Sequence, residues 1–193
     1  KAFDWYADAK NFAKQLSVKY QISIVKVAKV IAALSPRQRW ETNKKMAELC
    51  IASWSSNLER PKVHVFSAMS NTAYAILDEK PFNLGPKVAN FAANILGYDA
   101  LVTVDSLAIS IPLGLYEYAG SYKFKQPVYQ FVESLYIHAA QVVGVSPSKM
   151  QAITWVVCRR LKAENKSKFN VLDAYNAVGT KRKDIVTWLC EQS

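Results

Sequence analysis

The chain has 193 residues, of which 51% are hydrophobic, and this is enough for one globular domain that buries its own core. No apolar run reaches the roughly 18 residues that a membrane span requires and no signal peptide opens the sequence, so we expect no membrane partner and a cytoplasmic location. A net charge of +10 and a pI near 9.5 favour a polyanionic partner, with nucleic acid as the first candidate.

Apolar residues recur at helical spacing along nearly the whole chain, which predicts an all-α fold. The second helix should stop at Ser35-Pro36, because the residue before a proline avoids the α region. Gly144 should end the seventh helix, and Ser146-Pro147 should cap and open the eighth. The expected helices cover residues 3–20, 22–34, 40–53, 67–77, 88–96, 106–113, 126–143, 147–163, 171–177 and 181–191.

Two features of this pattern bear on the tertiary arrangement. Residues 88–96 are apolar on almost every side, which predicts a central, buried helix. We expect a single domain over residues 1–193, in which 22–114 form a helical barrel and 1–21 together with 115–193 form a second, smaller lobe.

The cysteines indicate no cofactor. Cys50, Cys158 and Cys190 are odd in number, lie far apart and form no C-x-x-C pair, zinc spacing or iron–sulfur spacing. Buried, reduced thiols are the expected state. His64 and His138 have no ligand-like neighbours in the sequence, so we assign them no function and expect no metal.

The most informative stretch begins at Asn83. A turn that presents backbone N–H groups to a phosphate needs residues that tolerate positive φ, and Gly85 meets this need, with Asn83 as the next best residue. Pro86 and Lys87 then open an apolar helix, whose positive end favours an anion. A short β-branched run follows and leads to Asp105, at the head of another apolar helix.

This stretch resembles the helix-hairpin-helix DNA glycosylase superfamily, the endonuclease III and 8-oxoguanine glycosylase group. Its members carry L-P-G-V-G-x-K-x-A, an apolar helix and then V-D; here F-N-L-G-P-K-V-A precedes V-D, with eighteen positions from Lys87 to Asp105. The segment from Val30 to Lys44 resembles the family's DNA wedge, and the segment 151–160 resembles a late helix that carries a tryptophan and then an arginine.

The chain also departs from the family pattern. The four-cysteine cluster of endonuclease III is absent, so no iron–sulfur cluster is implied. Asn83 replaces the first hairpin glycine and Pro86 precedes the lysine. Short members of this kind occur among bacteriophage proteins, which places the expected location in the cytoplasm of a bacterium or a phage-infected cell.

The resemblance implies a helix-hairpin-helix glycosylase-like bundle and a DNA glycosylase with AP-lyase activity. Asp105 would support departure of the base by stabilising positive charge on the sugar, and Lys87 would attack the sugar C1′ to form a Schiff base. The plain alternatives are that Asp105 is only the N-cap of the next helix and that Lys87 contacts phosphate or solvent.

The resemblance also implies a set of DNA contacts. Asn83 and Gly85 would hold the backbone, and Arg37, Gln38 and Arg39 would lie in the wedge-like segment, where Arg37 and Gln38 could fill the hole left by a flipped base. The remaining candidates are Arg159 for the DNA backbone, with complementing the helix dipole as the alternative, and Trp40 and Trp155 for a base pocket, with core packing as the alternative for Trp40.

Several expectations stay open. Arg160 could also contact the backbone, Lys181-Arg182-Lys183 should add nonspecific DNA affinity, and Tyr116, Tyr118, Tyr122 and Tyr129 fit core packing better than a pocket. The partner should be double-stranded DNA, bound by a monomer without a cofactor. The alternative functions are a noncatalytic DNA-binding helix-hairpin-helix module and a phage enzyme that processes hypermodified bases.

Overall fold

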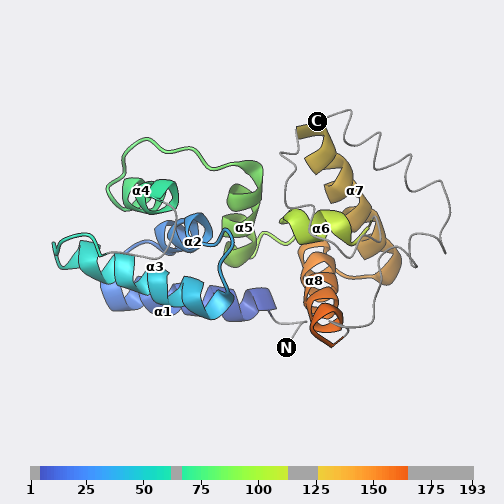
Figure 1. The fold of residues 1–193 in the computed structure, drawn as a ribbon, viewed down its shortest axis with the longest axis horizontal. Coiled ribbons are helices and arrows are strands. Elements are labelled where there is room, and N and C mark those ends of the chain that lie inside the picture. The colour runs from blue at the N-terminus through green and yellow to red at the C-terminus, as the bar shows by residue number, and fades with distance from the viewer. Residues whose placement is uncertain (1–4, 62–66, 113–125, 165–193) are drawn as a thin grey trace. The chain divides into compact units, whose positions relative to one another are not determined.

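The computed structural model describes residues 5–61, 67–112 and 126–164, and every regular element in these ranges is a helix (Figure 1). The all-α class is therefore confirmed. The helices expected at 171–177 and 181–191 lie outside the described residues. The described helices are α1 (Trp5–Tyr20), α2 (Ile24–Ala33), α3 (Trp40–Ser55), α4 (Ser67–Leu77), α5 (Pro86–Leu96), α6 (Ser106–Ser110), α7 (Gln126–Val143) and α8 (Pro147–Glu164).

The described residues form two compact units, with the boundary between Tyr98 and Asp99. We call them the N-terminal unit, which contains α1 to α5, and the C-terminal unit, which contains α6 to α8. This division differs from the expected one, in which residues 1–21 shared a lobe with the C-terminal part. The reason is that α1 turns Ala9, Ala13 and Leu16 inward and packs against α2, α3 and α5.

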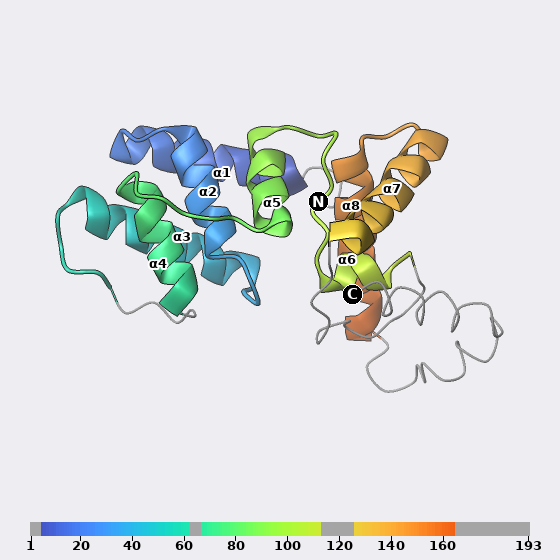
Figure 2. The same ribbon diagram turned by 90° about the horizontal axis from the view of Figure 1, so that it is seen from above.

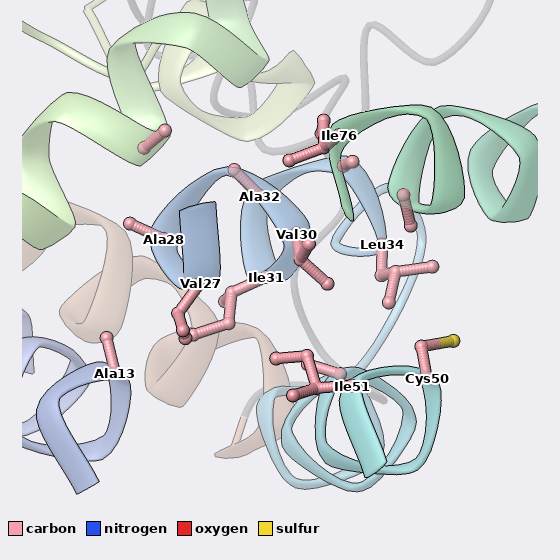
Figure 3. Packing of buried hydrophobic residues seen from close by; sticks show 14 of the residues in the cluster. Ala13, Val27, Ala28, Val30, Ile31, Ala32, Leu34, Cys50, Ile51 and Ile76 are labelled. Atoms are coloured by element: carbon pink, nitrogen blue, oxygen red, sulfur yellow. The ribbon is translucent and has the colours of Figure 1, made fainter. Parts of the chain in front are cut away.

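The centre of the N-terminal unit is α2. It contacts α1, α3, α4 and α5, and Val27, Ala28, Val30 and Ile31 on it are fully buried (Figure 3). Four helices pack around α2, which explains why most of its residues are apolar. The expectation that α5 is the central helix is wrong, since α5 buries one side and leaves Ala89 exposed.

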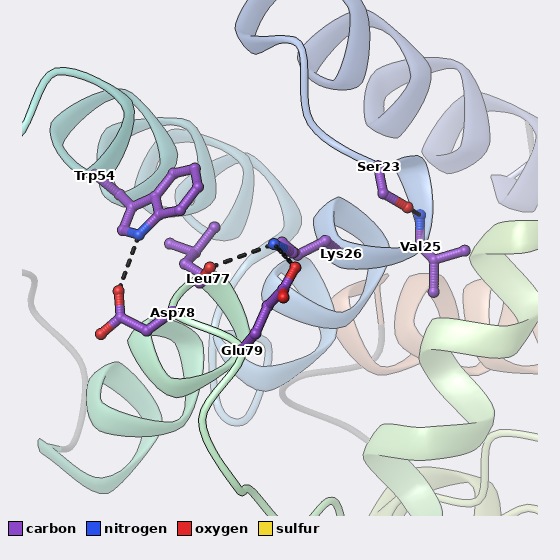
Figure 4. A network of polar contacts seen from close by, with 7 residues as sticks. All are labelled: Ser23, Val25, Lys26, Trp54, Leu77, Asp78 and Glu79. Atoms are coloured by element: carbon purple, nitrogen blue, oxygen red, sulfur yellow. Dashed lines mark hydrogen bonds and ion pairs between the residues drawn. The ribbon is translucent and has the colours of Figure 1, made fainter.

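Polar side chains form hydrogen bonds and an ion pair near the C-terminal ends of α3 and α4 (Figure 4). Lys26 donates to Glu79 Oε1 at 2.7 Å and to the carbonyl of Leu77 at 3.4 Å. It therefore provides a donor for one of the carbonyls that the last turn of α4 leaves without a partner inside the helix. The indole of Trp54 donates to Asp78 Oδ1 at 2.9 Å. These contacts tie the end of α4 to α2 and α3.

The C-terminal unit is organised by α7 and α8, which pack along each other (Figure 2). Gly144 ends α7 with a φ of 75°, and its N–H donates to the carbonyl of Ala140 at 2.9 Å. Pro147 then opens α8, as the sequence predicts. A separate apolar cluster fills this unit, formed by Val102, Val104, Ala108, Ile109, Val128, Tyr129, Val132 and Tyr136.

Candidate functional site

The segment that leads to Asp105, residues 102–104, has no regular secondary structure, and the described residues contain no strand. A tyrosine side chain supplies hydrogen bonds to this backbone: the hydroxyl of Tyr129 accepts from the N–H of Val104 at 3.2 Å and donates to the carbonyl of Val102 at 2.9 Å. Glu133, one turn later on α7, accepts from the N–H of Val102 at 3.2 Å. Buried backbone groups need such partners, and here α7 supplies them.

Asp105 is the N-cap of the short helix α6. Its Oδ1 accepts from the N–H of Ala108 at 2.7 Å. The carbonyl of Ala108 in turn accepts from the hydroxyl of Tyr136 at 2.9 Å. Burial holds the pKa of Tyr136 well above its usual range, against the opposing effect of a hydrogen bond with Thr154. The phenol therefore stays a neutral donor that fixes the first turn of α6.

The other oxygen of Asp105 is bound by a residue fifty positions away in the sequence. The indole N–H of Trp155 on α8 donates to Asp105 Oδ2 at 3.0 Å. The guanidinium carbon of Arg159 lies 4.8 Å from the centroid of the Trp155 ring, in cation–π geometry. Asp105, Trp155 and Arg159 thus come together in the C-terminal unit, as three residues that the sequence nominates separately.

Lys87 is the second residue of α5, after Pro86 at the first position and Gly85 at the N-cap. Its side chain is half-buried. Gly85 has a φ of −61° and a ψ of 160°, and a Cβ added to it meets no atom within 4 Å. The expectation of positive φ is wrong for Gly85 and also for Asn83, because the described residues with positive φ are Gln21, Arg37, Asn57, Glu79, Gly97 and Gly144.

The wedge-like segment contains a strained turn. The N–H of Gln38 donates to the carbonyl of Ser35 at 3.1 Å, Pro36 takes the second position and Arg37 the third, with a φ of 60°. This is the pattern of a type II turn, which normally has glycine or asparagine at the third position. Gln21, Asn57 and Glu79 also have positive φ, but they lie one or two residues after helix ends, where this conformation is common.

The residues around this turn have separate roles. Arg37 and Arg39 are exposed, Gln38 is half-buried, and Arg39 is the N-cap of α3 without a side-chain cap bond. Below the turn, the side-chain amide of the buried Asn43 donates to the carbonyl of Ile31 at 3.0 Å. Asn43 therefore joins α3 to the last turn of α2, from which the strained turn departs.

Trp40 belongs to an aromatic cluster of the N-terminal unit. Its ring centroid lies 5.1 Å from that of Trp5 and 6.1 Å from that of Phe12, and Trp5 in turn stacks on Phe91 at 5.8 Å. Trp40 is half-buried and packs against the core of this unit, as the core-packing alternative expects.

Tyr129 is buried in the C-terminal unit, which confirms core packing for that residue.

Other candidates fall into two groups. His138 is exposed on α7, and Cys50 and Cys158 are buried free thiols. His64, Tyr116, Tyr118, Tyr122, Lys181, Arg182, Lys183 and Cys190 lie outside the described residues, and nothing is described for the side chain of Arg160. In the part of the chain that the structure describes, no group of three or more His, Cys, Asp and Glu side chains is placed to hold a metal ion.

Tyr129, Glu133 and Tyr136, which position the Asp105 segment, are not identified by sequence reasoning as functional. Their spacing along α7 puts all three on one face of the helix, and this shared face is the sequence pattern that could have identified them. The sequence also places no partner on Trp155. A contact between residues fifty positions apart leaves no local pattern.

None of the helices within the described ranges is long and apolar enough to cross a membrane.

Comparison with known proteins identifies the family of the chain. No curated protein and no solved structure matches the chain. A family model described as a family of unknown function (DUF7178) matches residues 1–162, which run from the N-terminal unit through most of α8. The chain therefore belongs to the DUF7178 family.

Proposed function

We propose that the protein is a DNA glycosylase with AP-lyase activity, which removes a modified or damaged base from double-stranded DNA as a cytoplasmic monomer. The observation that carries the proposal is the hydrogen bonding of Asp105. Its two oxygens accept from two N–H donors, the backbone of Ala108 and the indole of Trp155. Both donors fix the direction of the carboxylate, a group that can stabilise a positive charge developing on a sugar.

The N-cap bond leaves acceptor sites on the carboxylate of Asp105 for further hydrogen bonds. An ionised carboxylate has about four lone-pair sites on its two oxygens. Ala108 and Trp155 use one site on each oxygen, so Asp105 can serve as the N-cap of α6 and still accept from or face a substrate. The structural and the catalytic interpretations of Asp105 are therefore compatible.

Lys87 supplies the nucleophile in this proposal. Its neutral amine attacks C1′, the bond between C1′ and the base breaks, and the base leaves with the electron pair of that bond. The C1′–O4′ bond then breaks while a proton passes from Nζ to O4′, and this opening of the sugar ring gives an iminium between C1′ and Nζ, from which the strand can be cleaved. The pairing of Lys87 with Asp105 rests on the residue types and their order along the chain. Lys87 lies in the first turn of α5 in the N-terminal unit, and Asp105 is the N-cap of α6 in the C-terminal unit.

The DNA-binding part of the proposal has two supports. The chain carries a net charge of +10, which favours a phosphate backbone as partner. In addition, Arg37 holds a left-handed conformation that costs an L-residue about 1–2 kcal/mol, at an exposed position where a glycine would cost less. Strain of this kind tends to be kept where a side chain has a function.

A specific observation also favours a second function, a noncatalytic DNA-binding module. Asp105 Oδ1 fulfils a complete structural role as the N-cap of α6, and Gly85 has an ordinary extended backbone. A binding module needs neither the charge of Asp105 nor the amine of Lys87, and this difference separates the two proposals.

The deciding experiment is borohydride trapping on duplex DNA that carries an abasic site or a modified base. Borohydride reduces an iminium to a stable amine and so links enzyme to DNA. We expect a covalent adduct that is lost in Lys87→Ala and kept in Lys14→Ala, which removes an exposed lysine from α1. Asp105→Asn removes the charge while keeping an oxygen that can cap α6, and we expect it to lower base release.

The other outcomes are equally informative. Base release without an adduct means a monofunctional glycosylase that depends on Asp105. Salt-sensitive DNA binding without base release or adduct refutes the enzyme and supports the binding module.

A further inference from the structure

The carboxylate of Asp105 is held against rotation by two donors from different elements. The N–H of Ala108 on α6 binds Oδ1 at 2.7 Å, and the indole N–H of Trp155 on α8 binds Oδ2 at 3.0 Å. A turn of the carboxylate about its Cβ–Cγ bond would break both hydrogen bonds. The cap alone would constrain the carboxylate through one oxygen only.

The indole is itself fixed on α8. Arg159 lies one turn further along this helix, with its guanidinium carbon 4.8 Å from the ring centroid of Trp155. The ring is half-buried, and α8 packs against both α6 and α7. Trp155 thus has one ring face covered by Arg159 and its single N–H directed at Asp105. The N–H bond in the ring plane fixes the orientation of the indole relative to the carboxylate, which is the property that a positioning residue needs.

We propose that Trp155 is a positioning residue for Asp105: its N–H orients the carboxylate, so that the remaining acceptor sites face the sugar of the target nucleotide. This inference rests on the proposed glycosylase function and replaces the base-pocket role of Trp155. A donor to a charged acceptor contributes more than a neutral pair, and a pre-oriented carboxylate needs no rearrangement when charge develops on the substrate.

The chain provides a matched control in its other unit. The indole of Trp54 donates to Asp78 Oδ1 at 2.9 Å, so the same pair of groups occurs there at nearly the same distance. Nothing in the proposed reaction uses Trp54 or Asp78. Equal changes at Trp155 and Trp54 therefore separate an effect on the reaction from an effect on folding.

The first test needs no substrate. The indole N–H resonance of Trp155 is assigned in a ¹H–¹⁵N spectrum of the whole protein by its loss in Trp155→Phe. We expect Asp105→Asn to shift this resonance and Ser106→Ala, at the neighbouring position, to leave it in place. A Trp155 resonance that does not respond to Asp105→Asn overturns the proposal, whether or not the protein is an enzyme.

The second test removes only the donor. β-(3-Benzothienyl)alanine has nearly the shape of tryptophan with sulfur in place of the N–H, and it is introduced at position 155 or at position 54. At 155 we expect kcat for base release to fall about tenfold to a hundredfold with KM little changed. At 54 we expect kcat to stay at the wild-type value, although both variants lose some thermal stability.

Three results contradict the inference in different ways. A rise in KM with kcat unchanged makes Trp155 a wall of the binding pocket. Full kcat in the 155 variant overturns the positioning role and leaves the glycosylase function intact. A wild-type protein that releases no base overturns the proposed function and with it the purpose assigned to the pair.

Discussion

Gly85 and Gly97 are the N-cap and the C-cap of α5, and the structure predicts different costs for replacing them by alanine. Gly97 has a φ of 102°, where an L-residue is strained by about 1–2 kcal/mol, and its new Cβ would meet the flexible Lys10 Nζ at 2.9 Å. Gly85 has a φ of −61°, which alanine adopts freely, and its new Cβ meets nothing. There, the lower entropy of the unfolded chain offsets the poorer N-cap, so we expect a change near zero.

Thermal and urea unfolding followed by circular dichroism measure both variants. At about 2–4 °C per kcal/mol for a chain of this size, Gly97→Ala should lower the melting temperature by about 2–8 °C, while Gly85→Ala stays near the wild type. Equal destabilisation by the two substitutions would refute the backbone assignment of Gly85. If Gly85→Ala folds normally but binds duplex DNA more weakly, the glycine serves a close approach by the phosphate backbone.

Three further outcomes follow from single side chains. Tyr129→Phe removes the hydroxyl that accepts from the N–H of Val104 and donates to the carbonyl of Val102, so urea unfolding should show a loss of about 1–3 kcal/mol, and a loss below about 0.5 kcal/mol would contradict the hydrogen bonds described. Burial, with the neighbouring Cys50 thiol adding to it, raises the pKa of Tyr74 to about 12. The folded state thus favours the neutral phenol: the contribution of Tyr74 is complete below about pH 10 and falls by about 1.4 kcal/mol per pH unit from there to pH 12, and Tyr74→Phe should remove this part of the slope. Arg37→Gly should leave the melting temperature unchanged or higher while weakening DNA binding; a marked loss of stability would show that the arginine is kept for folding.

The helices could be predicted closely because their signals are local. The range 67–77 and the range 126–143 agree with α4 and α7, and the proline and glycine signals at Pro36, Gly144 and Pro147 act where expected. Which helix is central could not be predicted. Both α2 and α5 have an apolar surface, and the packing of α1, α3 and α4 decides that α2 is enclosed.

The candidate site divides in the same way. The N-cap role of Asp105 is readable from its place before an apolar helix, since the cap bond spans three residues. Its bond to Trp155 spans fifty, and the sequence contains no periodicity that relates the two. The conformation of Gly85 was predicted wrongly because glycine permits positive φ without requiring it.

The side chains of α7 hold residues 102–108 through backbone atoms: Tyr129 and Glu133 bind main-chain groups of Val102 and Val104, and Tyr136 binds a main-chain carbonyl of α6. Such contacts do not depend on which side chains the segment carries, but they depend on its length. One inserted residue adds up to about 3.6 Å of chain between the contacts of α7 and Asp105, which would take the carboxylate out of reach of Trp155. Relatives that use this carboxylate should therefore vary in residue type along the segment and never by insertion or deletion.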